Sequence, residues 1–343
     1  MKKYCINSDD NLINALKQLN RLKSFSMTLL VLDNNQRVLG TLTDGDIRRA
    51  LINGKSRWSS VKEAMNEKFG YLQDNKNIPK LSELRKKRIT LIPVLDRDLH
   101  LTDIIDLTQI KSKIPIDAVL MAGGKGERLR PLTEKTPKPL LKIGDKCIID
   151  YNIDHLIDYG VNNIYVTVNY LGEQLEEHFS NPRNGIFVRT IREPKFLGTL
   201  GSIKFVETFK NDVVLVMNSD LFTNINFEDM YRHFQENNAD MSVAAVPYVV
   251  SVPLGIFELD GRNIKGVTEK PTYNYYANAG IYLIRRKLIE SIPDDTFYNA
   301  TDFMEQLIAN GYNVIRYPIT GYWIDIGKPE EFRRAQDFVK HLK

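Results

Sequence analysis

The stretch DAVLMAGGKGERLRPLTEKTPKP, residues 117–139, decides the fold of the larger part of this chain. Its opening run, DAVLMA, is apolar without two-residue alternation, which predicts a strand buried on both faces of a parallel sheet. Three glycines follow almost at once, and basic residues are then interspersed with three prolines. Because glycines let backbone N–H groups approach a phosphate closely, the loop after this strand is a candidate anion site.

Strand and helix patterns alternate beyond this loop. Apolar runs such as NIYVTVNY (163–170) and DVVLVMNSD (212–220) are separated by helical patterns such as IDYNIDHLIDYG (149–160). We therefore predict an α/β fold for residues 116–343, with a doubly wound, Rossmann-like sheet that is mixed but mostly parallel. Ligands of such sheets bind beyond the carboxyl ends of the strands, which is where the glycine loop falls.

The first 113 residues contain a weak internal repeat. Residues 29–51 (LLVLDNNQRVLGTLTDGDIRRAL) and 91–107 (LIPVLDRDLHLTDIIDL) each predict a strand, an aspartate turn, a second strand and a helical run. An amphipathic helix is predicted before each copy. We predict a small α+β pair made of residues 1–57 and a degenerate second copy, residues 58–113, with a short polar linker to the α/β domain.

The composition is that of an ordinary globular chain. Its 343 residues are 43% hydrophobic and 26% charged, which is enough for roughly two domains with their own cores. A net charge of +4 is too small to predict nucleic-acid binding, and no apolar run approaches the ~20 residues of a membrane span. No apolar signal segment follows MKKYCINSDD, and the two distant cysteines are expected to be reduced, so we predict a cytoplasmic protein.

Two phosphate-binding motifs do not fit the glycine loop. GxxxxGK[ST] fails from Gly124, and GxGxxG fails because its sixth position is Leu129. The pattern that remains, GGxGxR…PLT…PKP, resembles the sugar-1-phosphate nucleotidyltransferases. The resemblance continues in the expected order over residues 116–335, through EPKFLGTLGS (193–202), MNSDLF (217–222), PLGIFELDGRNIKGVTEKP (253–271), NAGIYLI (278–284) and GYWIDIGKPEEF (321–332).

This resemblance implies roles for particular residues. Arg128 and Lys138 would act on the triphosphate, and Lys270 would hold the phosphate of the sugar. Asp220 and Asp325 would bind Mg²⁺, a hard cation that takes carboxylate and phosphate oxygens. The nucleotide would contact Leu120, Ala122, Gly123, Gly124, Gly126, Gly198 and Thr199, and the sugar would contact Gly255, Glu269, Lys270 and Asn278.

The residue types suit the reaction that the resemblance implies. In that reaction a sugar 1-phosphate takes a nucleotidyl group from an NTP, and pyrophosphate is released. A phosphate monoester with a second pKa of about 6 is already mostly dianionic at neutral pH, so no general base is required. The obstacle is the repulsion between two anions, which fixed cations and a divalent metal would overcome. Ordinary structural alternatives remain: a strand-end turn for Asp220, an arginine ion pair for Asp325 and a solvated side chain for Lys270.

The segment GTLTDGD, residues 40–46, resembles the signature of CBS domains, which come in tandem pairs. That resemblance implies that Thr43 and Asp46 could hold the ribose of an adenine nucleotide, because a carboxylate accepts hydrogen bonds from ribose hydroxyls. The alternative is that Asp46 caps the following helix and binds no ligand. Both interpretations stay open, and we expect the pair to hold subunits together in a homo-oligomer or to sense a nucleotide.

The base and the sugar are suggested only by resemblance. The ensemble of motifs is similar to the guanylyltransferase branch, and a CBS pair before a short transferase resembles the bacterial enzymes that make GDP-glucosamine for legionaminic acid, a surface-glycan precursor. We therefore expect GTP and glucosamine 1-phosphate. The alternatives are a mannose-1-phosphate guanylyltransferase, a glucose-1-phosphate uridylyl- or thymidylyltransferase, a catalytically silent regulatory subunit and, disfavoured by the EKP motif, a cytidylyltransferase acting on an alcohol phosphate.

Overall fold

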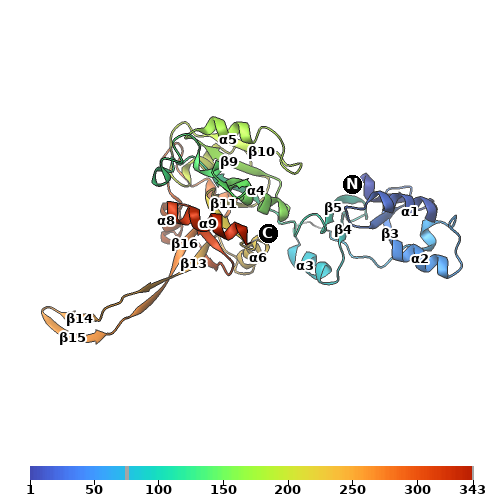
Figure 1. The fold of residues 1–343 in the computed structure, drawn as a ribbon. Helices are drawn as coiled ribbons and strands as arrows, with labels where there is room; N and C mark the ends of the chain where they lie inside the picture. Colours follow the sequence, from blue (N-terminus) through green and yellow to red (C-terminus); the bar gives the residue numbers. More distant parts are fainter. Residues whose placement is uncertain (74–76, 342–343) are drawn as a thin grey trace. The chain divides into compact units, whose positions relative to one another are not determined.

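The computed structural model describes residues 1–73 and 77–341, and the chain divides into two compact units (Figure 1). The first unit contains Met1–Pro115 and Ile157–Val161, and the second contains Ile116–Leu156 and the chain from Asn162 onward. None of the helices in the described ranges is both long enough and apolar enough to cross a membrane.

The first unit has a small core between two helices and a three-stranded sheet. In that sheet β1 is parallel to β2, and β2 is antiparallel to β3, whereas β4 and β5 form a separate hairpin. Leu12 and Leu19 of α1 are buried in the same cluster as Leu30 and Leu42 of the sheet. The elements are β1 (Cys5–Asn7), α1 (Leu12–Arg21), β2 (Thr28–Leu32), β3 (Val38–Thr43), α2 (Asp44–Ile52), α3 (Ile78–Lys86), β4 (Leu91–Leu95) and β5 (Leu101–Asp106).

The two copies of the predicted repeat differ after their second strand. The first copy continues into α2, as expected, but the second ends with strand β5, and no helix follows it before the second unit begins. The expectation of a helical run at the end of the second copy was therefore wrong. The segment LTDIID pairs with β4 in the strand register Leu91↔Asp106 to Leu95↔Leu101. It also has Ile105 three residues after Thr102, whereas the cap of α2 needs Asp46 three residues after Thr43.

The second unit is built around a seven-stranded sheet in the order β10-β9-β6-β11-β16-β13-β17. Neighbouring strands are parallel except where β16 meets β11 and β13, so the predicted mixed, mostly parallel sheet is confirmed. On one face of the sheet, Val214 and Val216 share a core with Phe303 and Leu307 of α8. The elements are β6 (Asp117–Met121), β7 (Lys142–Ile143), β8 (Lys146–Cys147), α4 (Ile148–Asp158), β9 (Ile164–Val168), α5 (Gly172–His178), β10 (Val188–Arg192), β11 (Val213–Asn218), β12 (Leu221–Thr223), α6 (Phe227–Glu236), β13 (Met241–Ser251), β14 (Ile256–Asp260), β15 (Asn263–Thr268), β16 (Thr272–Arg285), α7 (Arg286–Ile289), α8 (Ala300–Ala309), β17 (Val314–Pro318), β18 (Trp323–Asp325) and α9 (Pro329–Lys340).

The carboxyl ends of the central strands lie together. The parallel register of β6 and β11 runs from Asp117↔Val214 to Met121↔Asn218, so the glycine loop after Met121 starts beside the residues that follow Asn218. A separate two-stranded ladder, β12 with β18, pairs Leu221 with Asp325. The topology thus brings three segments that are far apart in sequence to one edge of the sheet.

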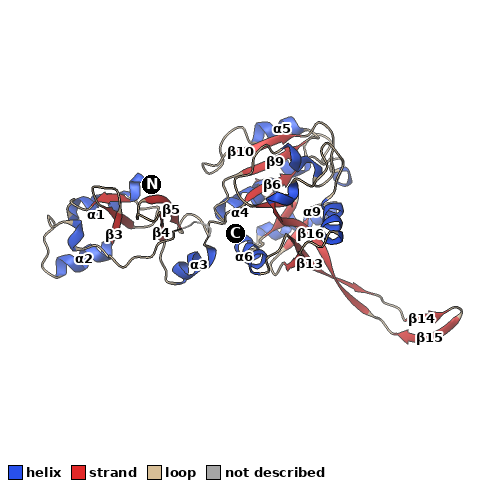
Figure 2. Cartoon of the chain, turned by 180° about the vertical axis from the view of Figure 1, so that it is seen from behind, coloured by secondary structure: helices blue, strands red, loops and turns tan. Residues whose placement is uncertain are grey.

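Strands β13 and β16 continue beyond the sheet as a two-stranded ribbon. Their antiparallel register runs from Met241↔Ile284 to Ser251↔Thr272, and β14 and β15 form the tip of the ribbon. We call residues 246–277 the arm. In Figures 1 and 2 the arm projects away from the sheet, and its tip packs on no other element of the second unit that the structure describes. The sequence analysis did not predict it.

Candidate functional site

The glycine loop borders a cavity of about 570 Å³ at the carboxyl ends of β6 and β11. We call it the glycine-loop cavity. Its wall consists of Met121, Ala122, Gly123, Gly124, Lys125, Gly126, Glu127, Arg128, Lys138, Pro139, Asn169, Phe196, Ser219 and Asp220. Of the residues predicted to contact the nucleotide, Ala122 and the three glycines line the cavity. Leu120 does not, because its side chain is fully buried within β6.

Two of the glycines are required by close approach and by backbone conformation. A Cβ on Gly123 would lie 2.4 Å from Oε1 of Glu193, so a larger residue there would have to displace that buried carboxylate. Gly126 has φ of 62°, in the left-handed region that favours glycine. Gly124 faces open space, which leaves its backbone accessible from the cavity.

Two carboxylates and two cations meet beside the loop. Lys138 and Asp220 form an ion pair whose side chains are 10% and 21% exposed. Asp325 is the last residue of β18, which pairs with β12. The backbone N–H of the next residue, Ile326, donates to the Asp220 carbonyl oxygen at 3.1 Å, so Asp325 lies beside Asp220. Arg128 packs against Gly327, two residues after Asp325, because a Cβ on Gly327 would come within 2.9 Å of the Arg128 guanidinium. The structure therefore brings these four predicted residues together.

The carboxylate pair is electrostatically incomplete. Burial raises the pKa of Asp325, and the neighbouring carboxylate of Asp220 raises that pKa further, while Lys138 and Arg128 act in the opposite direction. Oδ1 of Asp220 is buried and, in the described part of the chain, has no hydrogen-bond partner. A buried carboxylate oxygen without a donor is costly, and a divalent cation is the group that would satisfy both acids. These residues therefore fit Mg²⁺.

Arg128 also lines a second cavity of about 750 Å³, on the side of Asp325. We call it the carboxylate cavity. It is bordered by aromatic residues, among them Tyr248 at the base of the arm, Tyr322 and Trp323. The Trp323 indole N–H donates to the Ala279 carbonyl at 2.9 Å, which fixes this wall to β16. The two acids thus lie where two cavities meet, with Asp220 facing one and Asp325 the other.

Residues of the segment EPKFLGTLGS contact two different parts of the second unit. Glu193 and Phe196 lie at the glycine loop, since Phe196 lines its cavity and Glu193 stands directly behind Gly123. Gly198 and Thr199, which were predicted to contact the nucleotide, instead pack against the start of α8. A Cβ on Gly198 would lie 2.7 Å from the Tyr298 carbonyl oxygen, and the Thr199 hydroxyl accepts from the Ala300 N–H at 3.0 Å.

Glu193 carries a buried carboxyl group. Its side chain is 4% exposed, and burial raises the pKa of the carboxyl above its ordinary value, although the Leu197 backbone N–H donates to Oε2 at 3.2 Å and partly offsets the effect. The sequence analysis identified the segment but not this residue.

The predicted sugar-binding residues are not brought to either cavity. Gly255 and Glu269 lie on the arm, close enough that a Cβ on Gly255 would be 2.8 Å from the Glu269 carboxylate. Lys270 follows at a positive φ of 46°, just before β16. Asn278, at the base of the arm, donates to the Tyr282 hydroxyl at 2.9 Å and borders a different, smaller cavity. None of the four lines the glycine-loop or carboxylate cavity.

In the first unit, Thr43 and Asp46 bind each other. The Thr43 N–H donates to Oδ2 of Asp46 at 2.8 Å, and the Asp46 N–H donates to the Thr43 hydroxyl at 3.3 Å, which is a reciprocal cap of α2. Arg49 also forms an ion pair with Asp46. The arrangement is the capping alternative of the sequence analysis, and it uses the carboxylate that a ribose would need.

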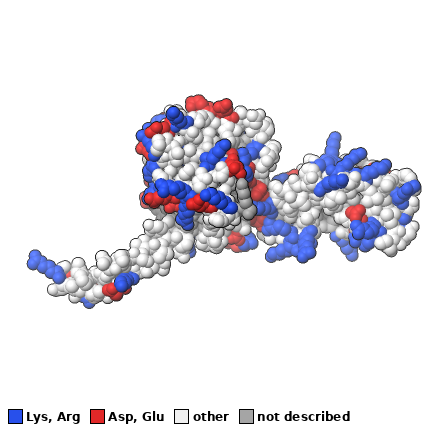
Figure 3. Space-filling view, in the orientation of Figure 1, with Lys and Arg blue, Asp and Glu red and all other residues white. Residues whose placement is uncertain are grey.

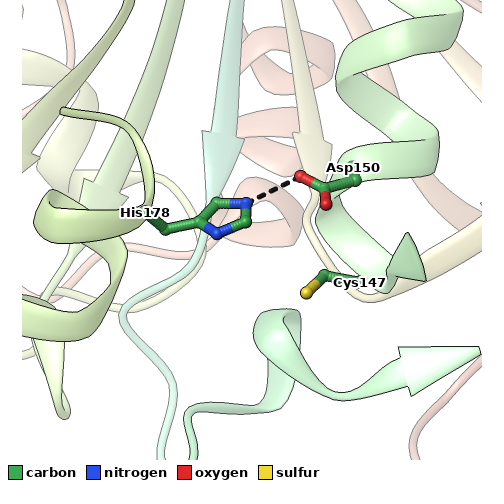
Figure 4. A group of neighbouring side chains, drawn as sticks. All are labelled: Cys147, Asp150 and His178. Carbon is green, nitrogen blue, oxygen red and sulfur yellow. Dashed lines mark hydrogen bonds and ion pairs between the residues drawn. The ribbon is translucent and has the colours of Figure 1, made fainter. Parts of the chain in front are cut away.

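A cluster of Cys147, Asp150 and His178 has the residue types of a metal site (Figure 4). Nε2 of His178 lies 2.8 Å from Oδ1 of Asp150, but the Arg183 guanidinium lies 2.9 Å from the same oxygen. Burial, and then Asp150, raises the pKa of the Cys147 thiol, which disfavours the thiolate that a metal requires. We interpret the cluster as an ion-paired tie between α4 and the chain after α5.

Seven residues that line the glycine-loop cavity were not among the predicted site residues: Met121, Lys125, Glu127, Pro139, Asn169, Phe196 and Ser219. The Ser219 hydroxyl donates to the Met121 carbonyl at 2.7 Å, joining the ends of β11 and β6. Asn169 and Ser219 directly follow strands β9 and β11. Their positions after buried strands were a usable signal, because the carboxyl ends of parallel strands share one edge.

The fold and the site define a nucleotide-handling α/β domain, and residues 117–341 match the family model described as Nucleotidyl transferase. Since that match covers more than half of the chain, this chain belongs to the nucleotidyl transferase family. Residues 1–53 match the CBS domain model, which confirms a CBS domain at the N-terminus.

Named relatives are similar to about two thirds of the chain. A putative mannose-1-phosphate guanyltransferase of Sulfolobus acidocaldarius is 28% identical over 66% of the chain, and a bifunctional GlmU protein of Methanocaldococcus jannaschii is 30% identical over 65%. The matches span 64% and 54% of those proteins' own lengths.

Solved structures agree with this fold. The crystal structure of HddC from Yersinia pseudotuberculosis is 26% identical, with a TM-score of 0.52 over 65% of this chain and 99% of that one. A putative glucose-1-phosphate thymidylyltransferase from Bacillus anthracis, at 22% identity and a TM-score of 0.53 over 66% of this chain and 96% of that one, shares the fold.

Proposed function

We propose that this chain is a sugar-1-phosphate nucleotidyltransferase that transfers a guanylyl group from GTP to a hexose 1-phosphate and releases pyrophosphate. One observation carries the proposal. Arg128 and Lys138 of the glycine-loop segment, Asp220 and Asp325 come from three segments that are far apart in sequence, and they meet beside the glycine loop at the carboxyl edge of the sheet. Two fixed cations and two acids beside open backbone N–H groups suit a reaction between two phosphates.

The residues of the site act by binding and by charge. Backbone N–H groups of the glycine loop would hold the triphosphate, as Gly124 faces open space. The Arg128 guanidinium would donate hydrogen bonds to phosphate oxygens. The Lys138 ammonium, which is paired with Asp220, would also contact the phosphate. Because the attacking sugar phosphate is already anionic, no side chain has to remove a proton.

Mg²⁺ would be held by Asp220 and Asp325, and when bound it neutralises charge on the phosphates of the two substrates. Lys138, with its side chain only 10% exposed, would keep the pair of acids from carrying two uncompensated charges.

Glu193 supports guanine as the base. Guanine presents two adjacent donors, N1–H and N2–H, whereas uracil and thymine present a single N–H between two carbonyls. A carboxylate accepts paired donors, and charge-assisted hydrogen bonds of this kind are the stronger ones. Glu193 stands directly behind Gly123 of the glycine loop, and its buried carboxylate would gain from such donors. The name of the Sulfolobus acidocaldarius relative points to the same base.

Glucosamine 1-phosphate is the hexose phosphate that we propose first. Its support is the resemblance of the domain order, a CBS domain before a short transferase, to enzymes that supply legionaminic acid synthesis. The Sulfolobus acidocaldarius relative supports mannose 1-phosphate as the second candidate. We further propose that the CBS unit is the place for an adenine nucleotide, if Asp46 exchanges Thr43 for a ribose.

The experiment is a substrate panel. Pyrophosphate release is measured with four NTPs against glucosamine, mannose and glucose 1-phosphates, each with MgCl₂ and with EDTA. We expect release only with both substrates and metal, and the fastest with GTP. An exposed-site variant, Asp337→Asn, whose side chain is 72% exposed in α9, serves as the matched control for acid substitutions. Absence of turnover with every pair would contradict the proposal and favour a catalytically silent subunit.

A further inference from the structure

The arm is an amphipathic ribbon whose apolar face is exposed to solvent. At its tip Phe257 pairs with Val267, and Leu259 pairs with Ile264, so these four side chains share one face. All four are between 56% and 64% exposed. The other face carries polar groups, including an ion pair at 2.9 Å between Lys265 and Asp260. Such patterning predicts that something covers the apolar face.

The exposed area is large enough for a stable interface. Eleven large apolar or aromatic side chains of the arm are at least 37% exposed. Since one aromatic side chain can bury 150–250 Å², these exposed fractions amount to on the order of 1,000 Å². A stable interface needs about 800 Å² from each partner. Figure 3 shows that the displayed side of the arm is mostly uncharged, with charged groups near its tip.

A two-stranded ribbon is at best marginally stable in water without cover. The rest of the second unit does not provide it, because β13 and β16 stay paired out to Ser251 and Thr272, with one register shift between Val243 and Ala245, and the ribbon projects away from the sheet. Tyr276 pairs with Pro247, which lines the carboxylate cavity. Lys270 lies six residues from Tyr276, which is roughly 20 Å further along the ribbon at ~3.3 Å per residue. The arm therefore carries Lys270 and Glu269 away from its own cavities.

We propose that a second copy of this chain covers the arm, and that in this dimer the arm of each protomer reaches the carboxylate cavity of the other. The assignment of Lys270 to the sugar phosphate rests on the proposed function. A different protein could cover the apolar face, but it would leave every site without Lys270, whereas a second copy offers a cavity lined by Arg128 and Asp325.

The carboxylate cavity matches the arm in chemistry. Tyr322 and Trp323 give its wall an aromatic surface suited to the apolar face of the tip, and Arg128 provides a cation that shares a phosphate with an incoming lysine. Reciprocal exchange of one arm for the other is a two-fold arrangement, in which each interface is made twice. In such a dimer each carboxylate cavity receives an arm, and the apolar face of each arm is covered.

The first test concerns assembly and does not depend on activity. The full chain at micromolar concentration should sediment at twice the mass of one chain. Phe257→Ser with Leu259→Ser should convert it to a monomer with an unchanged circular dichroism spectrum, since both side chains are exposed. Glu258→Ser, on the polar face beside them, is the matched control and should stay dimeric. A monomeric wild type, or a dimer that survives the double substitution, would overturn the proposal.

The second test locates the tip. A benzoylphenylalanine photo-crosslinker at position 257, in a mixture of ¹⁴N- and ¹⁵N-labelled chains, should join peptides of different labels, with the partner peptide drawn from the wall of the carboxylate cavity. Crosslinks confined to one chain would overturn arm exchange. If the wild type stays monomeric and sediments with anionic lipid vesicles, the apolar face binds a membrane, and arm exchange is overturned as well.

The third test uses mixed dimers. One chain carries Asp220→Asn and the other Lys270→Ala, and two affinity tags isolate the heterodimer after co-expression. If arms are exchanged, one site holds both substitutions and the other is intact, so about half of wild-type activity returns while each homodimer stays nearly inactive. No recovery in the heterodimer would overturn arm exchange. If the wild type itself has no activity, the proposed function fails, and the first two tests still decide the dimer.

Discussion

The backbone N–H of Ile326 donates to the carbonyl oxygen of Asp220 at 3.1 Å, and this single hydrogen bond sets Asp220 beside Asp325 at the carboxyl edge of the sheet. The ladder of β12 and β18 continues the contact through Leu221↔Asp325. Because the backbone fixes both acids, their side chains can face a cation without a preceding rearrangement.

Removing either acid should abolish most turnover while preserving the fold. Asp220→Asn and Asp325→Asn keep the size of the side chain but remove a charge from the metal position, so we expect each to lower kcat by at least about 100-fold. Circular dichroism and thermal unfolding should be close to wild type, and Asp337→Asn should retain full activity. Wild-type turnover in both acid variants would contradict the assignment.

Lys138→Met should destabilise the protein by about 3 kcal/mol, because it leaves the buried acid pair without its nearest cation. The loss should be partly reversed by MgCl₂, and the increase in melting temperature with Mg²⁺ should be larger for this variant than for wild type. Lys340→Met removes an exposed pair in α9 and should change stability by less than about 0.5 kcal/mol. An equal response of both variants to Mg²⁺ would argue against a metal at the acid pair.

The sequence was sufficient for the features that depend on local patterning. The buried strand before Gly123, the strand that ends before Asp220 and the capped helix after Thr43 all follow from residues close in the chain. The α/β sheet and the glycine loop at its carboxyl edge could therefore be predicted.

Other features depend on packing between distant segments. β12 and β18 have three residues each, too short for a periodic signal, so the contact between Asp220 and Asp325 came only from resemblance. Gly198 and Glu193 belong to one motif, but Gly198 packs against Tyr298 and Glu193 against Gly123. These contacts are with residues distant in sequence, so the motif alone does not predict them. The arm was missed because its apolar alternation is that of a strand packed on the core, whereas its large apolar side chains are exposed.

Gly198→Ala should affect stability more than substrate binding. Gly198 has φ of 80° and its Cβ would meet the Tyr298 carbonyl at 2.7 Å, so we expect a loss of about 3 kcal/mol from backbone strain and overpacking. Gly185→Ala is the matched control, since Gly185 has the same φ but open space around its Cβ, and it should lose only about 1 kcal/mol. Urea unfolding of the two variants measures the difference, and equal losses would show that the contact with Tyr298 is unimportant.

Glu193→Gln should change the pH dependence of stability. Burial raises the pKa of Glu193 in the folded state, so the folded protein binds more protons than the unfolded chain as the pH rises through and above the ordinary pKa, and stability falls. Glutamine carries no charge, and it can still accept from the Leu197 N–H. The variant should therefore match wild type near pH 4 and be more stable near pH 7. A difference in unfolding free energy that is constant between these pH values would contradict this prediction.

The same substitution tests the base. Glutamine offers one acceptor and one donor where the carboxylate offers two acceptors, so Glu193→Gln should lower kcat/KM for GTP at least about tenfold and narrow the preference for GTP over UTP. If the ratio of kcat/KM for GTP to kcat/KM for UTP is unchanged in the variant, Glu193 does not recognise the base. The assignments of the catalytic residues would not be affected.

Thr43→Ala should cost the first unit about 1 kcal/mol, because it removes the hydroxyl that caps α2. If Asp46 also binds an adenine nucleotide, calorimetry should detect AMP or ATP binding in wild type and a much weaker signal in Asp46→Ala. Heat of binding that is unchanged by Asp46→Ala would leave capping as the only role of this pair.

The most direct measurement is a crystal structure of the chain with Mn²⁺, a non-hydrolysable GTP analogue and a hexose 1-phosphate. The account predicts an anomalous manganese peak between the carboxylates of Asp220 and Asp325, with the triphosphate along Gly123–Gly126. A nucleotide bound elsewhere, or manganese absent from this acid pair, would contradict it.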